Sequence, residues 1–474
     1  MEIALSFDDI GIKPRKRVKN PRSISFRTKL TKGIELAIPL VAAGMRKVSN
    51  AQLAIALEQL GGAAFIHANQ SPEDQAKEIE KIKREEAIFI SHPYTLQSDY
   101  PLLFAKEAHE KFKVSGFPVV DVAKDFKLVG MITIRDWQWE NDFSKKIKDV
   151  MTPFEKLVVG KKGISVEEAK ELIRKNKIEK LPIIDEKGKL IGLMTAKDVF
   201  RESTNALKDK EGKLLGFANI NTGKDMIKRA DLLVEAGANC LAIEKAHAFG
   251  DDVLEAISLL KKRYKNKIEI LAGNVVTKEG AKALIDAGAD GIKVGMGIGA
   301  SCETPRVTGV WMPQVSAILN CRSVAHSAGI PLCADGGIRT SGDIVKALVV
   351  GASTVMIGAL FAGTEESPAE LVKKEGRLYK KYEGEGSVEA IKSRFEVGRY
   401  FWEEVPPEEI VAEGETGLVP YQGSLSKLVH QLLGGLRSAM IYLGALEIKD
   451  LWECEWFVIS FAGKEQASTR LEPI

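Results

Sequence analysis

The stretch IEILAGNVVTKEGAKALIDAGADGIKVGMG (268–297) holds two short apolar runs with a helical-period segment between them. The runs IEILAGNV (268–275) and GIKVGMG (291–297) are apolar at most positions, which is typical of parallel strands buried on both faces. The segment between them, TKEGAKALIDAG (277–288), has the periodicity of an amphipathic helix. The stretch therefore predicts a strand–helix–strand unit of an α/β fold.

The same alternation continues through most of the chain. Amphipathic segments such as DMIKRADLLVEAG (225–237) separate further apolar runs, which brings the number of predicted strands to eight. Eight β/α units favour a (β/α)8 TIM barrel, and an open α/β sheet is the alternative that the sequence leaves. The other six predicted strands are IPLVAAG (38–44), AAFIHA (63–68), LLGFANI (214–220), CLAIEKA (240–246), IPLCADGG (330–337) and TVMIGAL (354–360).

The gap between the second and third predicted strands is much longer than the others. It contains an internal repeat, in which SGFPVVDVAKDFKLVGMITIRD (115–136) is echoed by EKLPIIDEKGKLIGLMTAKD (179–198). Such a repeat is one supersecondary unit duplicated and packed on its twin, and barrel loops tolerate insertions of this kind. The predicted domains are a barrel of residues 1–90 and 201–474 and an inserted pair of residues 91–200, with halves at about 91–146 and 147–200.

The composition excludes several classes of protein. The chain has 474 residues, too many for one ordinary core, and its 45% apolar and 28% charged residues are typical of a globular protein. A net charge of +3 gives no reason to expect nucleic acid or an acidic membrane as a partner. Five cysteines without CxxC spacing indicate reduced thiols and a cytoplasmic location. We expect neither a signal peptide nor a membrane span.

Glycines cluster directly after several predicted strands. Barrels of this type bind ligands at the carboxyl ends of their strands, where glycine lets backbone N–H groups approach an anion closely. Each glycine alone is explained equally well as a turn residue, whereas clusters after three successive strands favour a binding function. The glycines are Gly295, Gly297, Gly299, Gly336, Gly337 and Gly358.

Cys302 lies at the end of the first glycine cluster, in GMGIGASCETPR (295–306). A thiolate is a strong nucleophile, and a glycine-rich loop can present it to a ligand. Taken alone, a cysteine in such a loop is more often a small packing residue. The other four cysteines fall in apolar or helical segments and are predicted to be inert: Cys240, Cys321, Cys333 and Cys454.

Two further features are ambiguous on their own. Arg399 and Tyr400 adjoin other aromatic residues in EVGRYFWEE (396–404), where surface packing is the more common explanation. His247 follows a predicted strand, but no second histidine or cysteine stands at metal-ligand spacing. We therefore predict no metalloenzyme site.

Together these segments resemble the IMP dehydrogenase/GMP reductase family over nearly the whole chain. The most specific matches are AGNVVTKEGAKALIDAGADGIKVGMG (272–297) and CADGGIRTSGDIVKALVVGAS (333–353). The inserted repeat resembles the tandem CBS pair of that family. Further matching segments are LSFDDIGIKP (5–14), FRTKLTKGIELAIPLVAAGM (26–45), FAGTEESPAEL (361–371), YEGEGS (382–387) and VPYQGSLSKLVHQLLGGLRSAM (419–440).

The resemblance implies oxidation of IMP to XMP with NAD, a step in the guanine branch of purine nucleotide biosynthesis. In the family, the loop cysteine attacks C2 of the purine, hydride leaves to NAD, and a mobile flap enters the vacated site before water hydrolyses the covalent intermediate. By position, Cys302 is the nucleophile and Thr304 helps to position water. Arg399 and Tyr400 match the flap pair, with Arg399 as the general base.

The resemblance also implies a set of substrate-binding residues. Asp335 would hold the ribose hydroxyls, and Glu413 would face N1 of the purine. The remaining substrate-binding positions are Met45, Gly336, Gly337, Gly358, Tyr382, Gly384 and Gly386.

Three other sites follow from the same resemblance. Asp136 and Asp198 end the matching segments of the repeat, where CBS pairs contact the ribose of adenine or guanine nucleotides. The residues expected to contact NAD are Glu244, Asn274 and Gly295. The backbone carbonyls expected to bind potassium, a monovalent cation, are those of Gly297, Gly299 and Cys302.

Several positions depart from the family pattern. Arg46 stands where the family has aspartate, and Glu385 stands where a methionine covers the base. The cofactor-side aspartate is replaced by Glu244. Three serines that bind the 5′-phosphate in the family correspond to Ala43, Ala300 and Ala359. These departures lead to the hypothesis that the substrate differs from IMP at the phosphate, the base or both.

Two other functions remain open at this point. GMP reductase uses the same cysteine for NADPH-dependent reductive deamination, and TGVWMPQVSAI (308–318) is closer to that enzyme. Its members lack the flap pair, so GRYF (398–401) argues against it. The third candidate is a regulatory nucleotide-binding protein that has lost turnover. The resemblance further implies a homotetramer or octamer.

Overall fold

The computed structural model describes residues 3–84, 93–112, 114–196, 199, 206–392, 409, 411–460 and 463–464. The chain divides into two compact units. Met1–Glu85 and Asn205–Ile474 form the first unit, which contains the barrel, and Glu86–Thr204 form the second, which contains the internal repeat.

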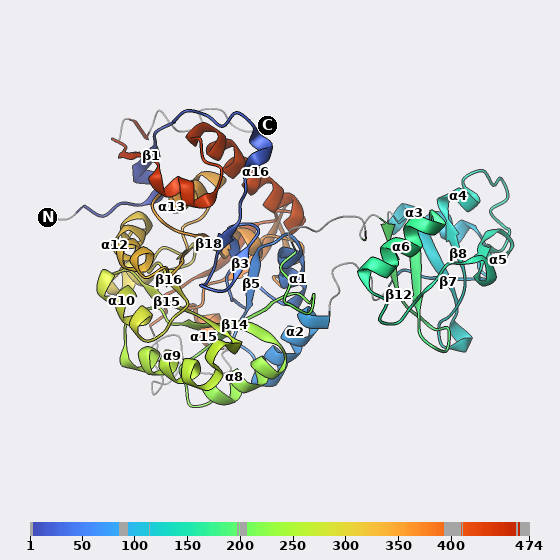
Figure 1. The fold of residues 1–474 in the computed structure, drawn as a ribbon, viewed down its shortest axis with the longest axis horizontal. Coiled ribbons are helices and arrows are strands. Elements are labelled where there is room, and N and C mark those ends of the chain that lie inside the picture. Colours follow the sequence, from blue (N-terminus) through green and yellow to red (C-terminus); the bar gives the residue numbers. More distant parts are fainter. Residues whose placement is uncertain are drawn as a thin grey trace. The chain divides into compact units, whose positions relative to one another are not determined.

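The first unit is built on a closed barrel of eight parallel strands (Figure 1). Neighbouring strands pair in parallel around the ring, and β5 closes the ring against β13. Each strand coincides with one of the eight predicted apolar runs, which confirms the barrel and excludes the open sheet. In ring order the strands are β13 (Gly216–Ile220), β14 (Ala238–Glu244), β15 (Glu269–Val275), β16 (Gly291–Val294), β17 (Leu332–Asp335), β18 (Thr354–Ile357), β4 (Leu40–Ala42) and β5 (Ala63–Ile66).

Several strands are shorter than predicted at their carboxyl ends. The apolar run at 291–297 continues to Gly297, but β16 ends at Val294. Gly295 and Gly297 have φ angles of 141° and 79°, a region that favours glycine and interrupts the strand. The glycine clusters therefore form loops at the mouth of the barrel and not the ends of its strands.

Helices surround the barrel (Figure 1). Side chains cap the N-termini of α1, α10 and α13; at the start of α13, for example, the Thr340 side chain accepts the backbone N–H of Asp343. No helix in the described part of the chain is long and apolar enough to cross a membrane. The longer helices are α1 (Ala51–Gln59), α2 (Pro72–Arg84), α8 (Met226–Glu235), α9 (Asp251–Tyr264), α10 (Lys278–Asp286), α12 (Gln314–Ser327), α13 (Ser341–Val349) and α16 (Leu425–Leu443), and the shorter ones are α11 (Thr304–Thr308), α14 (Ala359–Ala362) and α15 (Val388–Lys392).

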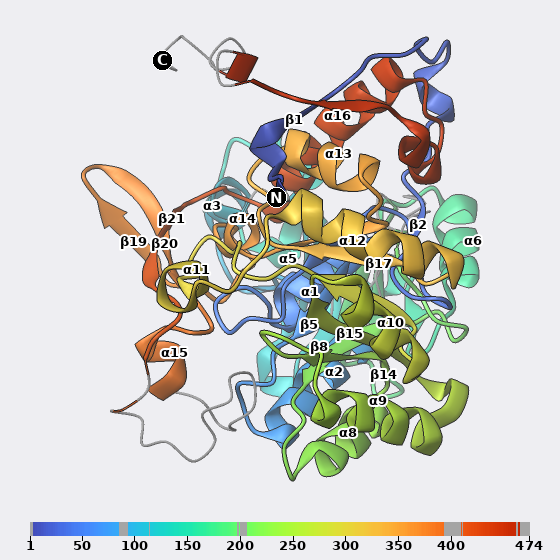
Figure 2. The same cartoon turned by 90° about the vertical axis from the view of Figure 1, so that its left-hand side faces the viewer.

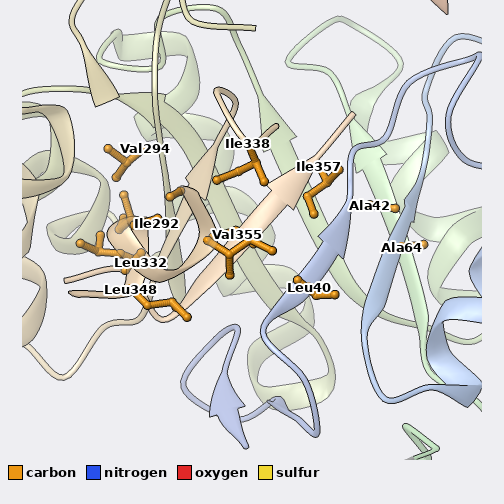
Figure 3. Close-up of a cluster of buried hydrophobic side chains, with 14 of the residues drawn as sticks. Leu40, Ala42, Ala64, Ile292, Val294, Leu332, Ile338, Leu348, Val355 and Ile357 are labelled. Carbon is orange, nitrogen blue, oxygen red and sulfur yellow. The ribbon is translucent and has the colours of Figure 1, made fainter. Parts of the chain in front are cut away.

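The main core lies between the outer face of the barrel and these helices. Figure 3 shows part of it, where Leu348 of α13 packs with Val355 and neighbouring strand residues. A second buried cluster fills the barrel interior, with Phe65 and Phe217 in edge contact at 5.4 Å between ring centroids. Alternate residues of each strand thus face these two cores, which explains the nearly continuous apolar runs.

Smaller sheets complete the first unit. β19 (Leu371–Lys374), β20 (Arg377–Glu383) and β21 (Thr416–Pro420) form an antiparallel sheet, and the β19–β20 hairpin projects from the barrel (Figure 2). The two-stranded sheets are β1 (Ile10–Ile12) with β22 (Trp456–Val458) and β2 (Thr28–Lys29) with β3 (Glu35–Leu36). Short 3-10 segments of the first unit span Phe7–Asp9, Pro21–Ser23, Lys265–Lys267 and Ile448–Glu453, and those of the second unit span Val122–Lys124 and Phe154–Lys156.

The second unit repeats one motif twice. FPVVD (117–121) lies on β7 and LPIID (181–185) lies on and just after β11, and each strand pairs antiparallel with the strand that follows it. The first sheet has the order β6 (Leu96–Gln97), β7 (Gly116–Asp121), β8 (Lys127–Thr133), β9 (Thr152–Pro153), and the second has the order β10 (Gly160–Lys161), β11 (Lys180–Ile184), β12 (Leu190–Thr195). Their helices are α3 (Leu103–Phe112), α4 (Ile134–Trp137), α5 (Ile147–Val150) and α6 (Val166–Asn176).

Candidate active site

A cavity of about 290 Å³ opens at the carboxyl ends of the barrel strands. Its lining comes from the loops after β4, β16, β17 and β18, from the end of β20, and from Glu413 before β21. We call it the barrel pocket. It lies where (β/α)8 barrels bind ligands, because these loops meet there.

Cys302 and Thr304 face each other at one side of the barrel pocket. The Cys302 thiol lies 3.2 Å from the Thr304 hydroxyl, which in turn donates to a carboxylate oxygen of Glu413 at 2.9 Å. Thr304 is almost fully buried, and all three residues line the pocket. The arrangement is a hydrogen-bonded path from a thiol through a hydroxyl to a carboxylate, which can carry a proton away from sulfur.

Backbone hydrogen bonds hold the cysteine loop against the segment before β21. The Glu303 N–H donates to the Glu413 carbonyl at 2.8 Å, and the Glu415 N–H donates to the Ser301 carbonyl at 2.9 Å. The Glu413 N–H donates in turn to the Gly386 carbonyl at 3.1 Å. Three segments far apart in sequence are thereby fixed beside one thiol.

The other cysteines are placed differently. Burial raises the pKa of the Cys321 and Cys333 thiols to about 12, and that of Cys240 also lies well above its usual range because of burial. These thiols stay protonated near neutral pH, whereas Cys302 is partly exposed to the pocket.

A buried polar layer forms the floor of the barrel pocket. Lys293 on β16 forms ion pairs with Glu244 on β14 and, at 3.0 Å, with Asp335 on β17. Asn274 on β15 donates to the same Asp335 oxygen at 2.9 Å, and Asn219 on β13 donates to Glu244. Five consecutive strands thus each contribute one polar side chain, because inward-facing residues of a barrel form layers.

Some positions of the pocket must be glycine, because neighbouring atoms lie too close to leave room for a side chain. A Cβ atom on Gly295 would lie 2.2 Å from the Asp335 carbonyl oxygen, and one on Gly358 would lie 2.8 Å from the Tyr382 hydroxyl. Tyr382 is buried, and its hydroxyl lies 3.5 Å from the Met45 sulfur. A larger residue at either glycine would displace groups that line the cavity.

Most residues predicted for substrate and catalysis meet in the barrel pocket. The lining includes Met45, Asn274, Gly295, Gly297, Gly299, Cys302, Thr304, Asp335, Gly336, Gly337, Gly358, Tyr382, Gly384, Gly386 and Glu413, together with Ala43, Ala300, Ala359 and Glu385.

Some predicted residues lie elsewhere. Glu244 does not line the barrel pocket but is buried at its floor, paired with Lys293. Asp136 belongs to the second unit, where it lines a separate cavity of about 550 Å³. Three further predicted residues fall outside the described part of the chain: Arg399, Tyr400 and Asp198.

Two features of the site were not predicted from the sequence. One is Lys293, although a charged residue inside the apolar run GIKV was a signal that could have revealed it. The other is the ion pair between Arg46 and Glu383 at the pocket wall. Arg46 was noted as a departure, but its partner was not identified because nothing local in the sequence links the two.

The residues implied for the cofactor and the cation fit these groups in part. In the described part of the chain, the buried side-chain oxygen of Asn274 has no hydrogen-bond partner, so it can accept a bond from an amide such as that of nicotinamide. The Gly299 carbonyl accepts the Cys302 N–H at 3.1 Å and keeps a second lone pair for a cation.

Comparisons with known proteins agree with this geometry. The model of the IMP dehydrogenase / GMP reductase domain matches residues 4–469. Inosine-5′-monophosphate dehydrogenase of Aquifex aeolicus is 45% identical over 98% of this chain and 94% of its own. The Helicobacter pylori protein of the same name is 44% identical over 98% of this chain and 96% of its own.

Solved structures give the same result. A cysteine-to-alanine variant of GMP reductase from Trypanosoma brucei superposes with a TM-score of 0.83 at 34% identity, covering 98% of this chain and 99% of that one. The same variant in complex with guanosine 5′-monophosphate has a TM-score of 0.77 at 35% identity, covering 100% and 99%. The fold, the thiol in its glycine loop and these matches converge on one conclusion: the chain belongs to the IMP dehydrogenase/GMP reductase family.

Proposed function

We propose that this protein is an NAD-dependent oxidoreductase that converts IMP to XMP through a covalent bond to Cys302. The observation that carries the proposal is the path from the Cys302 thiol through Thr304 to Glu413 at the wall of the barrel pocket. The curated relatives named inosine-5′-monophosphate dehydrogenase, at 41–45% identity over nearly the whole chain, support this reaction.

The protein's part in the first step is to form a carbon–sulfur bond. The thiol proton passes to the Thr304 oxygen while the Thr304 proton passes to Glu413, and sulfur adds to C2 of the purine. A nicotinamide held beside C2 would supply the acceptor for the hydride that leaves this carbon. Water then adds to C2 and the carbon–sulfur bond breaks, which yields XMP and returns the thiol.

The walls of the barrel pocket bind and orient the substrate in this proposal. Asp335 accepts the ribose hydroxyls, and its carboxylate is held for this by Lys293 and Asn274. Glu413 faces N1 of the base. Met45 and the segment at Gly384 and Gly386 cover the purine, while Gly336, Gly337, Gly358 and Tyr382 surround the phosphate end.

We also propose sites for the cofactor and a cation. Asn274, Gly295 and Glu244 are the residues proposed to contact NAD; the first two line the barrel pocket, and Glu244 is buried in the polar layer below it. The carbonyls of Gly297, Gly299 and Cys302 form a neutral set of oxygens suited to a monovalent cation such as potassium. A cation there would hold the cysteine loop in its curved form.

Arg399 and Tyr400 are proposed as the flap pair, with Arg399 as the base that activates water in the second step. Because the base acts only after hydride transfer, Arg399→Ala should slow hydrolysis far more than NADH formation. A burst of NADH followed by a slow steady state supports this role. Equal loss in both phases contradicts it.

GMP reductase is the second candidate, since the Trypanosoma brucei structures match this chain at full length. A hydroxyl–carboxylate path can also deliver a proton to departing ammonia, so the geometry suits both reactions. The deciding assay gives the purified protein IMP with NAD, and separately GMP with NADPH. NADH formation from IMP supports the proposal, ammonia release from GMP overturns it, and no turnover in either supports a regulatory protein.

We propose that the second unit is a tandem CBS pair that binds adenine or guanine nucleotides. Its cavity of about 550 Å³ carries Asp136 and Thr133 beside Lys156 and Lys177, and Arg135 lines it as well, paired with Glu179. A carboxylate for ribose and several cations for phosphates suit a nucleotide. We further propose a cytoplasmic location, because all five cysteines are free thiols. We propose a homotetramer or octamer because the chain belongs to this family over nearly its whole length.

A further inference from the structure

Lys293 lies at the centre of the buried polar layer below the barrel pocket. Its side chain is 1% exposed, and its ammonium group contacts both Glu244 and Asp335. Gly273 on the neighbouring strand makes room for it, since a Cβ there would lie 2.4 Å from the Lys293 Cβ. A glycine at position 273 is therefore needed for the Lys293 side chain to enter the barrel interior here.

The lysine joins two carboxylates to which the proposed function gives different roles. Asp335 lines the barrel pocket and is the proposed ligand of the substrate ribose, whereas Glu244 is buried in the polar layer and is a proposed contact of the cofactor. Lys293 and Asn274 both bind the same oxygen of Asp335, which fixes the plane of that carboxylate. Asn219 holds Glu244 from the opposite direction.

Stability of the fold does not by itself call for a charge here. Burying an ammonium and two carboxylates has a large desolvation cost, and apolar side chains of similar size often stabilise a core better. The Met356 sulfur lies 3.7 Å from the Lys293 nitrogen, so one apolar side chain already adjoins the ammonium group. The ion pairs thus point to a role in the site.

We infer that Lys293 is a positioning residue that keeps the Asp335 carboxylate oriented for the substrate by balancing its charge against Glu244. The inference rests on the proposed function in one respect, the role of Asp335 as the ribose ligand. Without the ammonium, two carboxylates that shared one cation would repel each other. Asp335 would then turn away from its present position.

The test measures IMP binding to the full chain by calorimetry in the absence of NAD. We expect Lys293→Met to weaken IMP binding ~10–100-fold, since it leaves buried carboxylates uncompensated. The double variant Lys293→Met/Glu244→Gln removes the repelling charge and should recover IMP affinity to within about threefold of wild type, a non-additive result. Lys261→Met, which breaks the partly buried pair with Asp290 (2.7 Å) away from the pocket, should leave IMP affinity unchanged.

The results distinguish the role of Lys293 from the proposed function of the protein. Wild-type affinity in Lys293→Met, or no recovery in the double variant, overturns the inference and leaves the proposed function intact. Wild-type protein that binds neither IMP nor GMP overturns both. If Lys293→Met does not fold, Glu244→Gln alone decides: undiminished IMP affinity with a raised KM for NAD supports the inference, and weaker IMP binding overturns it.

Discussion

Arg46 and Glu383 form an ion pair beside the barrel pocket, although 337 residues separate them in the chain. Arg46 follows Met45 after β4, and Glu383 ends β20 just before Gly384, so both neighbours of the pair line the cavity. The Glu383 side chain is only 4% exposed, and the next cations are lysine ammonium groups at 3.7 and 3.8 Å. The pair fixes the spacing between two walls of the pocket.

Breaking this pair is expected to weaken substrate binding. Arg46→Ala leaves Glu383 buried and incompletely compensated, so IMP affinity should fall about tenfold or more. The reversed pair Arg46→Glu/Glu383→Arg should recover much of it, and a double-mutant cycle on binding should show coupling of ~1–3 kcal/mol. Purely additive losses would contradict the role. Arg27→Ala, which breaks an exposed pair with Glu35, serves as the control with little expected effect.

Cys302→Ala is expected to abolish NADH formation from IMP while the protein stays folded. Backbone hydrogen bonds hold the Cys302 loop in place, and the thiol itself makes one hydrogen bond, to Thr304, so loss of the thiol removes the nucleophile and little packing. Activity assays and thermal unfolding measure the two effects. Cys454→Ala, a buried cysteine of the first unit, should retain turnover. Substantial activity in Cys302→Ala would exclude the covalent mechanism.

Thr304→Val is expected to lower kcat by ~10²–10⁴, because it interrupts the proton path from Cys302 to Glu413. Glu413→Gln should act in the same direction. The rate at which iodoacetamide alkylates Cys302 gives a second readout, and it should fall in both variants. Glu303→Gln is the matched control, since that carboxylate pairs with Arg306 at 3.1 Å and not with the thiol path. An alkylation rate unchanged by Glu413→Gln would disprove the path.

The phosphate end of the pocket is expected to bind phosphate weakly. Ala43, Ala300 and Ala359 offer no hydroxyl there, and each hydrogen bond to a charged group is worth about 1.5–3 kcal/mol. Arg339 lines the pocket, but its guanidinium is already paired with Asp8 at 2.6 Å. IMP should therefore gain little over inosine in kcat/KM, and Ala359→Ser should favour IMP. A micromolar KM for IMP that excludes all other purines would refute this.

Nucleotides are expected to bind to the second unit. ATP, ADP or GTP should give a calorimetric signal with the full chain, and Asp136→Asn should reduce it because Asp136 lines the cavity and would lose the charge proposed to bind the ribose. The exposed Asp142, which binds Ser144 locally, provides a control when changed to Asn. Absence of a signal with all three nucleotides would reduce the second unit to a structural module.

Local pattern was enough to place the eight strands, the repeat and the loop that bears Cys302. Buried parallel strands are apolar on both faces, and glycine marks the points where the backbone leaves the extended region, so both signals are readable without knowing the partners. The family resemblance then assigned Thr304 and Glu413 by position. The structure adds that the two are hydrogen-bonded to each other across 109 residues of sequence separation.

The sequence by itself determined the eight alternating strand and helix units and favoured a barrel over an open sheet, because apolar runs of this kind are buried on both faces. Only the tertiary structure decided which polar groups pair inside it. Lys293 pairs with Glu244 and Asp335, which lie on other strands of the barrel, and Arg46 pairs with Glu383, which is 337 positions away in the sequence. The physical reason is that these energies depend on distance and burial in three dimensions, and neither is encoded in the spacing of residues along the chain.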